Sequence, residues 1–219
     1  MMSQFNEQEA RAFLTAGGKN HVIGWQMTPE EAERSFRLQR KTVLTFFGYS
    51  VEYEDEAGML EIASWVLARC NPAVTFVNMG ATQGGIGAVY PMAKKLGFTT
   101  TGIVSRNALE IADEISPFVD HICFIADTEW GGEMPNGALY PTSEAMVRCS
   151  DWLVGIGGGP ISRDEMLAGR KRGKPVKFFP ADISHLWAME RAKKRGQPPP
   201  ISFSGEAHEV FAAKTRSSA

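Results

Sequence analysis

Short apolar runs alternate with stretches of helical character along most of the chain. Unbroken apolar strands between helices are typical of a parallel sheet that is covered on both faces. The pattern therefore predicts an α/β fold, a Rossmann-like doubly wound, mostly parallel sheet of about six strands. The expected strands are Thr42–Phe47, Val74–Asn78, Thr99–Val104, His121–Ala126, Trp152–Ile156 and Val176–Phe179.

Helices are expected between these strands and after the last of them. Their ranges are Glu56–Cys70, Ile86–Leu96, Ala108–Ser116, Ser143–Cys149, Arg163–Arg172 and Ile183–Arg195. We divide the chain into an N-terminal helical extension (1–41), a Rossmann-like domain (42–196) and a C-terminal tail (197–219) that packs on the domain or trails from it. Within the tail, Glu206–Ala213 is expected to dock as a short helix.

The N-terminal extension contains a strong signal for the start of a helix. In Thr28-Pro29-Glu30-Glu31, the threonine can cap, the proline suits the first helical position, and Glu31 can complete a capping box. This helix is expected to run to Lys41, after an earlier helix near Glu7–Ala16.

Composition narrows the class of protein. Hydrophobic residues make up 43% of the 219 residues and charged residues 22%, as in an ordinary globular protein. No apolar run approaches the roughly 18 residues of a membrane span, and the N-terminus lacks the pattern of a secretory signal. The three cysteines are odd in number and widely spaced, which fits neither a disulfide framework nor a metal site. We therefore expect a cytoplasmic protein without metal.

Charge makes nucleic acid an improbable partner. The formal net charge is −2, which offers no bulk attraction to a polyanion. Ten basic residues nevertheless gather between Arg163 and Arg195. We interpret them as solvated helical faces, with an anion-binding surface as the alternative.

Glycine is enriched, and its positions carry the first candidate site. The second expected strand is followed by a glycine-rich loop that runs into a helix. Such a loop turns backbone N–H groups inward, and a helix N-terminus adds partial positive charge, so together they suit a phosphate. A tight strand-to-helix crossing is the structural alternative. The candidate phosphate-binding residues of this loop are Gly80, Thr82, Gly84, Gly85 and Gly87.

A second glycine-rich loop follows the fifth expected strand. Gly157-Gly158-Gly159 with Ser162 as N-cap predicts another anion-binding loop at the same edge of the sheet. Glu165 could complete a capping box with Ser162. It could also lie beside a bound sugar as a catalytic carboxylate.

Two further loops at this edge are weaker candidates. Gly48, Tyr49 and Ser50 follow the first expected strand, where a small polar turn can admit a ligand. The link from Asp127 to Pro141 is long for a compact domain, which indicates a lid, an oligomer contact or a plain surface loop.

In this order, the motifs resemble the superfamily of the LOG-type cytokinin-activating phosphoribohydrolases and the molybdenum-cofactor carrier proteins. The resemblance runs from about Thr42 to Phe179, and Ser150-Asp151 through Gly158-Gly159 to Glu165 is similar to the family's motif A-D…P-G-G-x-G-T-x-x-E. It implies hydrolysis of the N-glycosidic bond of a nucleoside 5′-monophosphate with Glu165 as catalytic residue, no required cofactor, and a homodimer.

The chain departs from the family's pattern at four positions. Gly157 replaces the motif's proline, Ile161 a glycine and Ser162 the threonine, although Ser162 keeps the hydroxyl group. The family's catalytic arginine falls on Thr142. Arg148, about two turns later, could replace that arginine only if the helix is placed differently.

Other functions therefore stay open. The loss of the arginine favours a non-catalytic binder or carrier of a nucleotide or of molybdenum cofactor. An NADPH-dependent reductase would use Ser105 and Arg106 for the 2′-phosphate, but Tyr90 and Lys94 satisfy the reductase's Tyr-x-x-x-Lys pattern on the wrong helix. An interaction scaffold is the remaining alternative. We expect a nucleotide-type ligand, with its phosphate across the two glycine-rich loops.

Overall fold

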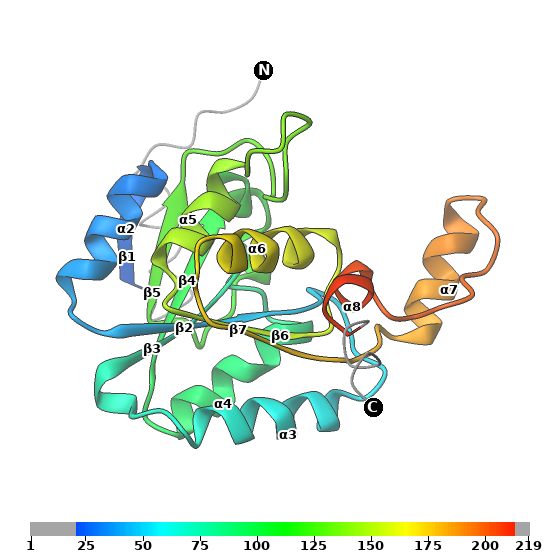
Figure 1. Ribbon diagram of the computed structural model, residues 1–219, viewed down its shortest axis with the longest axis horizontal. Helices are drawn as coiled ribbons and strands as arrows, with labels where there is room; N and C mark the ends of the chain where they lie inside the picture. The colour runs from blue at the N-terminus through cyan, green and yellow to red at the C-terminus, as the bar shows by residue number, and fades with distance from the viewer. Residues whose placement is uncertain (1–20, 213–219) are drawn as a thin grey trace.

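The computed structural model describes residues 21–212. Its centre is a seven-stranded, fully parallel sheet in the order β1-β5-β4-β3-β2-β6-β7 (Figure 1). The predicted Rossmann-like α/β fold is confirmed, and three of the expected strands have the predicted bounds. The strands are β1 (His21–Met27), β2 (Thr42–Phe47), β3 (Thr75–Met79), β4 (Thr99–Ser105), β5 (His121–Ile125), β6 (Trp152–Ile156) and β7 (Val176–Phe179).

The expected helical extension over residues 1–41 is wrong at residues 21–27, which form a seventh strand. His21–Met27 is the edge strand β1 and pairs with β5 through two register shifts. Its β-branched and aromatic residues Val22, Ile23 and Trp25 suit a strand. The helix expected near Glu7–Ala16 lies outside the described residues.

The predicted capping box is present at the start of α2 (Pro29–Leu38). The Glu31 N–H donates to Thr28 Oγ1 at 3.2 Å, and the Thr28 N–H donates to Glu31 Oε2 at 2.8 Å. That backbone hydrogen bond is the main cause that lowers the pKa of Glu31. The helix ends at Leu38, three residues before the expected position.

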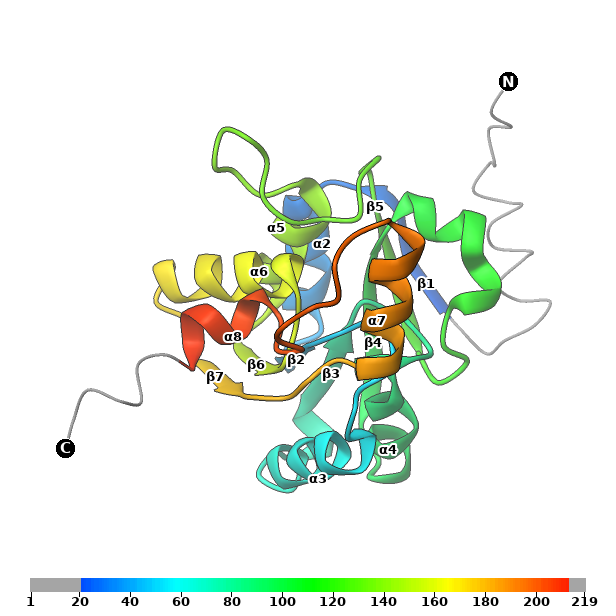
Figure 2. The same ribbon diagram turned by 90° about the vertical axis from the view of Figure 1, so that its right-hand side faces the viewer.

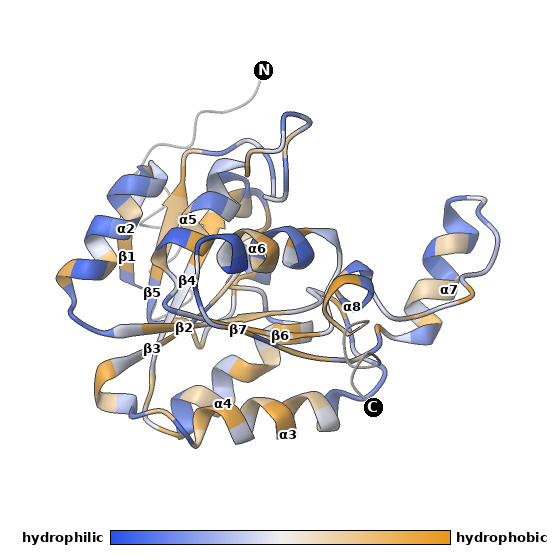
Figure 3. Cartoon of the chain, in the orientation of Figure 1, coloured by the Kyte–Doolittle hydropathy of each residue, from blue (hydrophilic) through white to orange (hydrophobic). Residues whose placement is uncertain are grey.

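Helices cover both faces of the sheet (Figure 1). On one face, α3 (Glu56–Leu67), α4 (Val89–Lys95) and the 3-10 segment η3 (Arg106–Glu114) pack on one cluster of buried apolar side chains. On the other face, a second cluster joins α2 to α5 (Pro141–Cys149), α6 (Pro160–Lys171) and the short α8 (Glu206–Phe211). Figure 3 shows apolar strands beneath largely hydrophilic outer surfaces of α2 and α6. Two short 3-10 turns also occur: η1 (Pro72–Val74) directly precedes β3, and η2 (Gly85–Ala88) directly precedes α4.

The last helices form the end of the molecule beyond β7. Figures 1 and 2 show α7 (His185–Lys194) projecting from the body, while the chain returns from it to α8 beside α6. The tail expected over residues 197–219 thus includes a docked helix, and the fully buried Ala207 anchors it. No helix among residues 21–212 is long and apolar enough to cross a membrane.

The strand order places a topological switch point between β2 and β6. From β2 the chain adds β3, β4 and β5 to one side, and it then crosses back to add β6 and β7 to the other side. In open parallel sheets, ligands bind outside the carboxyl ends of the strands at such a point. The loops after β2 and β6 therefore lie where a ligand is expected.

Candidate functional site

The two loops at the switch point are joined by buried hydrogen bonds. The Tyr53 hydroxyl donates to the carbonyl oxygen of Ile156 at 2.7 Å and accepts from the Tyr49 N–H at 3.1 Å. Burial raises the pKa of Tyr53 well above its usual range, so the hydroxyl stays protonated and keeps its donor role. The Ser162 hydroxyl donates to the carbonyl oxygen of Gly48 at 3.0 Å. These hydrogen bonds hold the two loops together.

The N-cap predicted for α6 is wrong. The helix begins at Pro160 with Gly159 as its N-cap, so Ser162 is the third helical residue. Proline suits the first helical position, and the helix starts three residues upstream of the expected position. Glu165 consequently lies inside the helix rather than in a capping box with Ser162.

The first glycine-rich loop has a packing reason for two of its glycines. A Cβ atom on Gly85, whose φ is +56°, would overlap the carbonyl oxygen of Tyr49, and one on Gly87 would overlap the carbonyl oxygen of Thr82. The Ile86 N–H donates to the same Tyr49 carbonyl at 2.8 Å. Gly85 thus lets the loop after β3 pack against the loop after β2, and Gly87 lets the loop after β3 fold closely on its own residue Thr82. Phosphate binding by them stays a prediction.

Three of the predicted residues line one pocket at this edge of the sheet. Ser50 from the loop after β2, together with Thr82 and Gly84 from the loop after β3, borders a cavity of about 430 Å³. Trp187 of α7 also lines it. We call this cavity the edge pocket. Sequence reasoning did not single out Trp187, because an aromatic residue in a basic helix carries no signal of a ligand site.

The edge pocket is acidic. Glu52, Asp113 and Glu114 also line it, and none of its lining residues in the described part of the chain is basic. Gln83 links two of its walls, since its Nε2 donates to the carbonyl oxygen of Asp113 at 2.5 Å. Carboxylates accept hydrogen bonds from hydroxyl and amino groups, so this pocket suits those groups better than it suits a phosphate.

Glu165, the predicted catalytic residue, is buried elsewhere. Its side chain accepts a hydrogen bond at Oε1 from the Ser143 hydroxyl at 2.7 Å, and that hydroxyl accepts one from the Gly132 N–H at 2.7 Å. Only 6% of Glu165 is exposed. Burial, against the opposing effect of the Ser143 hydrogen bond, raises the pKa of Glu165 to about 8. The side chain is therefore protonated at neutral pH.

Thr142, at the position of the family's arginine, is buried in the first turn of α5, next to Ser143 in the sequence. Its N–H donates to Asp127 Oδ2 at 2.8 Å. Its hydroxyl oxygen Oγ1 has no hydrogen-bond partner among the described residues. Arg148 does not supply the missing guanidinium, because it pairs with Glu33 at 2.8 Å and Glu30 at 3.0 Å of α2.

The long loop after β5, which runs from Asp127 to Pro141, covers Ser143, the residue that holds Glu165. Gly131 and Gly132 have φ values of +105° and +93°. A Cβ on Gly131 would lie 2.5 Å from Ser143 Oγ, and one on Gly132 would lie 3.5 Å from the Ile161 side chain. The loop thus passes directly over the residues that hold Glu165. Whether it acts as a lid or an oligomer contact stays a prediction.

The remaining predicted residues have separate environments. The Ser105 hydroxyl is buried and donates to the carbonyl oxygen of Asp127 at 2.9 Å. Arg106 is exposed and does not line the edge pocket. A Cβ on Gly80 would meet no atom within 4 Å. The structure therefore does not bring these three residues into one site.

Tyr90 and Lys94, which match the Tyr-x-x-x-Lys pattern of the reductase alternative, both have structural partners. Tyr90 is completely buried, and its hydroxyl donates to the carbonyl oxygen of Thr101 at 2.8 Å and accepts from the Ala81 N–H at 3.2 Å. Lys94 instead pairs with Asp120 at 2.6 Å. A tyrosine held in this way cannot reach a substrate.

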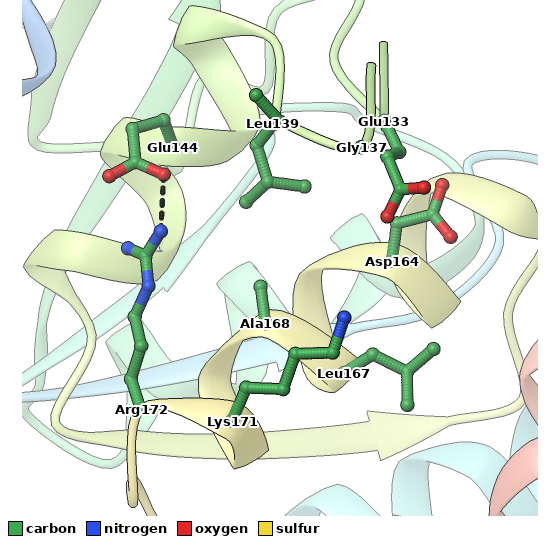
Figure 4. A pocket seen from close by; sticks show the side chains of 10 residues that line it. Glu133, Gly137, Leu139, Glu144, Asp164, Leu167, Ala168, Lys171 and Arg172 are labelled. Atoms are coloured by element: carbon green, nitrogen blue, oxygen red, sulfur yellow. Dashed lines mark hydrogen bonds and ion pairs between the residues drawn. The ribbon is translucent and has the colours of Figure 1, made fainter. Parts of the chain in front are cut away.

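A second pocket, of about 350 Å³, lies between the long loop and helices α5 and α6 (Figure 4). Its rim carries both signs of charge, with the Glu144–Arg172 ion pair at 2.6 Å along one side. Glu133 and Asp164 line another part of the rim (Figure 4). None of the predicted phosphate-binding residues in the described range lines it.

The comparisons with known proteins concern the fold. No protein-family model and no curated protein matches the chain. Two solved structures of the molybdenum cofactor carrier protein from Chlamydomonas reinhardtii are similar to it, at 21% and 22% identity, with TM-scores of 0.45 and 0.47; each similarity covers 64% of this chain and 76% of the carrier. The structural-genomics target TM1055 is similar at 20% identity and a TM-score of 0.43, over 62% of this chain and 72% of that one.

Proposed function

We propose that the protein binds a nucleoside- or nucleotide-type small molecule in the edge pocket and does not cleave it. The observation that carries the proposal is that Ser50, Thr82 and Gly84, predicted from separate loops, line one cavity with Trp187. The cavity's volume of about 430 Å³ falls in the range of about 300–1,000 Å³ that is usual for small-molecule sites.

The chemistry of the lining suits the base and the sugar of such a ligand. An indole ring such as that of Trp187 can stack on a base. The carboxylates of Glu52, Asp113 and Glu114 can accept hydrogen bonds from ribose hydroxyl groups, as an acidic residue does in many Rossmann folds. Ser50 and Thr82 add hydroxyl groups that donate or accept.

The position of Glu165 supports binding without hydrolysis. A general acid or base must come within hydrogen-bond reach of the substrate, and Glu165 is held by Ser143 beneath the long loop. Thr142 supplies no positive charge beside it. Hydrolysis, the second candidate, would need that loop to move away. The raised pKa of Glu165 is the one observation that favours it, since a protonated carboxyl group can act as a general acid.

Tryptophan fluorescence tests the proposal when adenosine, AMP and molybdopterin are titrated separately. A ligand in the edge pocket should quench the emission of the wild type, and Trp187→Phe should remove that signal. Trp130→Phe is the matched control, because Trp130 is 52% exposed on the long loop and should leave the signal unchanged. Each bound ligand is then incubated with the protein and assayed for free base by chromatography.

Quenching that depends on Trp187, without release of base, is the expected result. If the wild type releases free base and Glu165→Gln does not, the protein is a hydrolase and the proposal is refuted. Binding that is insensitive to Trp187 would place the ligand in another part of the molecule and refute the proposal.

A further inference from the structure

The second pocket, which we call the α6 pocket, is a cavity separate from the edge pocket. Residues 133–139 of the long loop, Glu144 of α5 and one face of α6 contribute to its lining (Figure 4). In the described part of the chain, its lining residues and those of the edge pocket do not overlap. Its volume of about 350 Å³ falls in the range of about 300–1,000 Å³ that is usual for small-molecule sites. A ligand in this cavity would be independent of the function proposed above.

The wall that the long loop contributes is a closed hairpin. At its tip, the Met134 N–H donates to the carbonyl oxygen of Ala138 at 2.7 Å. At its base, the Tyr140 N–H donates to the carbonyl oxygen of Gly132 at 2.9 Å, and the Gly132 N–H donates to the Ser143 hydroxyl of α5. These hydrogen bonds fix both ends of the hairpin. A ligand would therefore meet a preformed wall and would not have to order it on binding.

Asp164 brings a buried carboxylate to this cavity. Its side chain is only 9% exposed. Its Oδ1 accepts a hydrogen bond from Arg163 Nε at 2.8 Å, but its Oδ2 has no hydrogen-bond partner among residues 21–212. A Cβ built on Gly132 would lie 3.9 Å from that Oδ2, so this oxygen faces the hairpin wall. A carboxylate oxygen is an acceptor only, and Oδ2 is thus free to accept from a ligand.

Two more charged side chains of the pocket are unpaired. Within residues 21–212, neither Glu133 on the hairpin nor Lys171 on α6 has a side-chain hydrogen bond or an ion pair. By contrast, Glu144 and Arg172 pair with each other at 2.6 Å. The α6 pocket therefore offers free negative charge at Glu133 and Asp164 and free positive charge at Lys171.

These free charges follow one face of α6. Asp164 and Lys171 are two turns apart, so their backbones are separated by about 10 Å along the helix axis. Helical side chains lean toward the N-terminus of their helix, and Figure 4 shows the Lys171 side chain reaching along α6 in the direction of Asp164. Leu167 and Ala168, between the two in sequence, supply an apolar surface. An extended dipeptide is about 7 Å long, and the flexible lysine can cover the remaining distance.

We propose that the α6 pocket binds a small zwitterion of the amino-acid or short-peptide class. The amino group of the ligand donates to Asp164 Oδ2 and to Glu133, and its carboxylate pairs with Lys171. An apolar side chain of the ligand contacts Leu139 and Leu167. A calcium ion fits less well, because it takes about six to eight oxygen ligands and the ammonium group of Lys171 repels it.

Isothermal titration calorimetry at neutral pH tests the proposal with leucine and the dipeptide Gly-Leu. Tighter binding of the dipeptide assigns the site to short peptides, and tighter binding of leucine assigns it to free amino acids; either result supports the proposal. N-acetyl-Gly-Leu lacks the amino charge and Gly-Leu-amide lacks the carboxylate. Each of these blocked dipeptides should bind about three- to tenfold more weakly than Gly-Leu. Calcium chloride is the fifth probe.

Two substitutions remove one free charge each. Glu133 and Lys171 are exposed and unpaired, so Glu133→Gln and Lys171→Gln should fold like the wild type. Each should weaken the binding of the preferred zwitterion by about three- to tenfold. Glu129→Gln, on the same loop, and Lys95→Gln, at the end of α4, are the matched controls. Both control positions are exposed outside the pocket and change the net charge equally, so the affinity should stay that of the wild type.

The proposal would be overturned if neither zwitterion binds at millimolar concentration, or if the blocked dipeptides bind as tightly as Gly-Leu. Equal effects of the pocket substitutions and their controls would overturn it as well. Binding of calcium without binding of either zwitterion would replace it with a metal site. Trp187→Phe should leave the zwitterion bound, and loss of binding in that variant would place the ligand in the edge pocket instead. Failure of adenosine and AMP to bind the edge pocket would leave this test unaffected.

Discussion

The buried Glu165 should make the stability of the protein depend on pH, and Glu165→Gln should remove that dependence. The pKa of Glu165 rises from 4.5 to about 8 on folding, chiefly because burial disfavours the charged form. Between those two pH values the native protein holds a proton that the unfolded chain has released. The free energy of unfolding therefore falls as pH rises, and the contribution of this proton is complete below pH 4.5 and lost above pH 8.

The magnitude follows from the same two pKa values. Each pH unit between them lowers the free energy of unfolding by about 1.4 kcal/mol. Over the range from 4.5 to about 8, the loss reaches about 5 kcal/mol. Glutamine keeps the shape of the side chain and an oxygen that accepts from Ser143, but it does not titrate.

Urea unfolding of both proteins at pH 5, 6.5 and 8.5 in one buffer mixture measures this difference. At pH 5 the two free energies of unfolding should be within about 1 kcal/mol. At pH 8.5 the glutamine variant should be more stable by several kcal/mol. Glu209→Gln, at an exposed site, should follow the wild type at every pH. A constant difference between Glu165→Gln and the wild type, or one that reverses with pH, would refute the inference that Glu165 is buried and protonated.

Three further substitutions test the packing around the switch point by thermal and urea unfolding. Thr142→Val replaces a buried hydroxyl that has no partner among residues 21–212 by a methyl group and should stabilise the protein by about 1 kcal/mol; destabilisation would show that the hydroxyl is bonded. Gly158→Ala should cost roughly 1–3 kcal/mol, because φ is +122° and its Cβ would lie 2.7 Å from Ser162 Cβ; a neutral effect would contradict that backbone conformation. Tyr53→Phe should cost about 1–3 kcal/mol by leaving the carbonyl oxygen of Ile156 without its donor; wild-type stability would mean that this bond contributes nothing.

The strands were predictable because their apolar runs are short, unbroken and bounded by turns. The bounds of β2, β6 and β7 follow directly from that pattern. Strand β1 escaped prediction because Gly24 and Gln26 interrupt its apolar residues and because its pairing with β5 is irregular. Its place in the sheet depends on a partner about a hundred residues away, which no local pattern reveals.

Part of the candidate site was also predictable. Carboxyl ends of parallel strands meet at one edge, so Ser50, Thr82 and Gly84 could be expected near one another. The segments that cover the glycine turn after β6 and Glu165 could not be predicted from the sequence. Glu206 reaches the glycine turn after β6 from far along the chain, and the burial of Glu165 depends on the path of the long loop at Gly131 and Gly132.

Hydrogen exchange of backbone amides with and without adenosine tests the central claim most directly, because it locates the ligand. Binding in the edge pocket should slow exchange in residues 50–52 and 82–84 and at the start of α7, where Trp187 lies. It should leave residues 157–162 and the start of α5 unchanged. Slower exchange at those last two segments instead would place the ligand beside Glu165 and contradict the account.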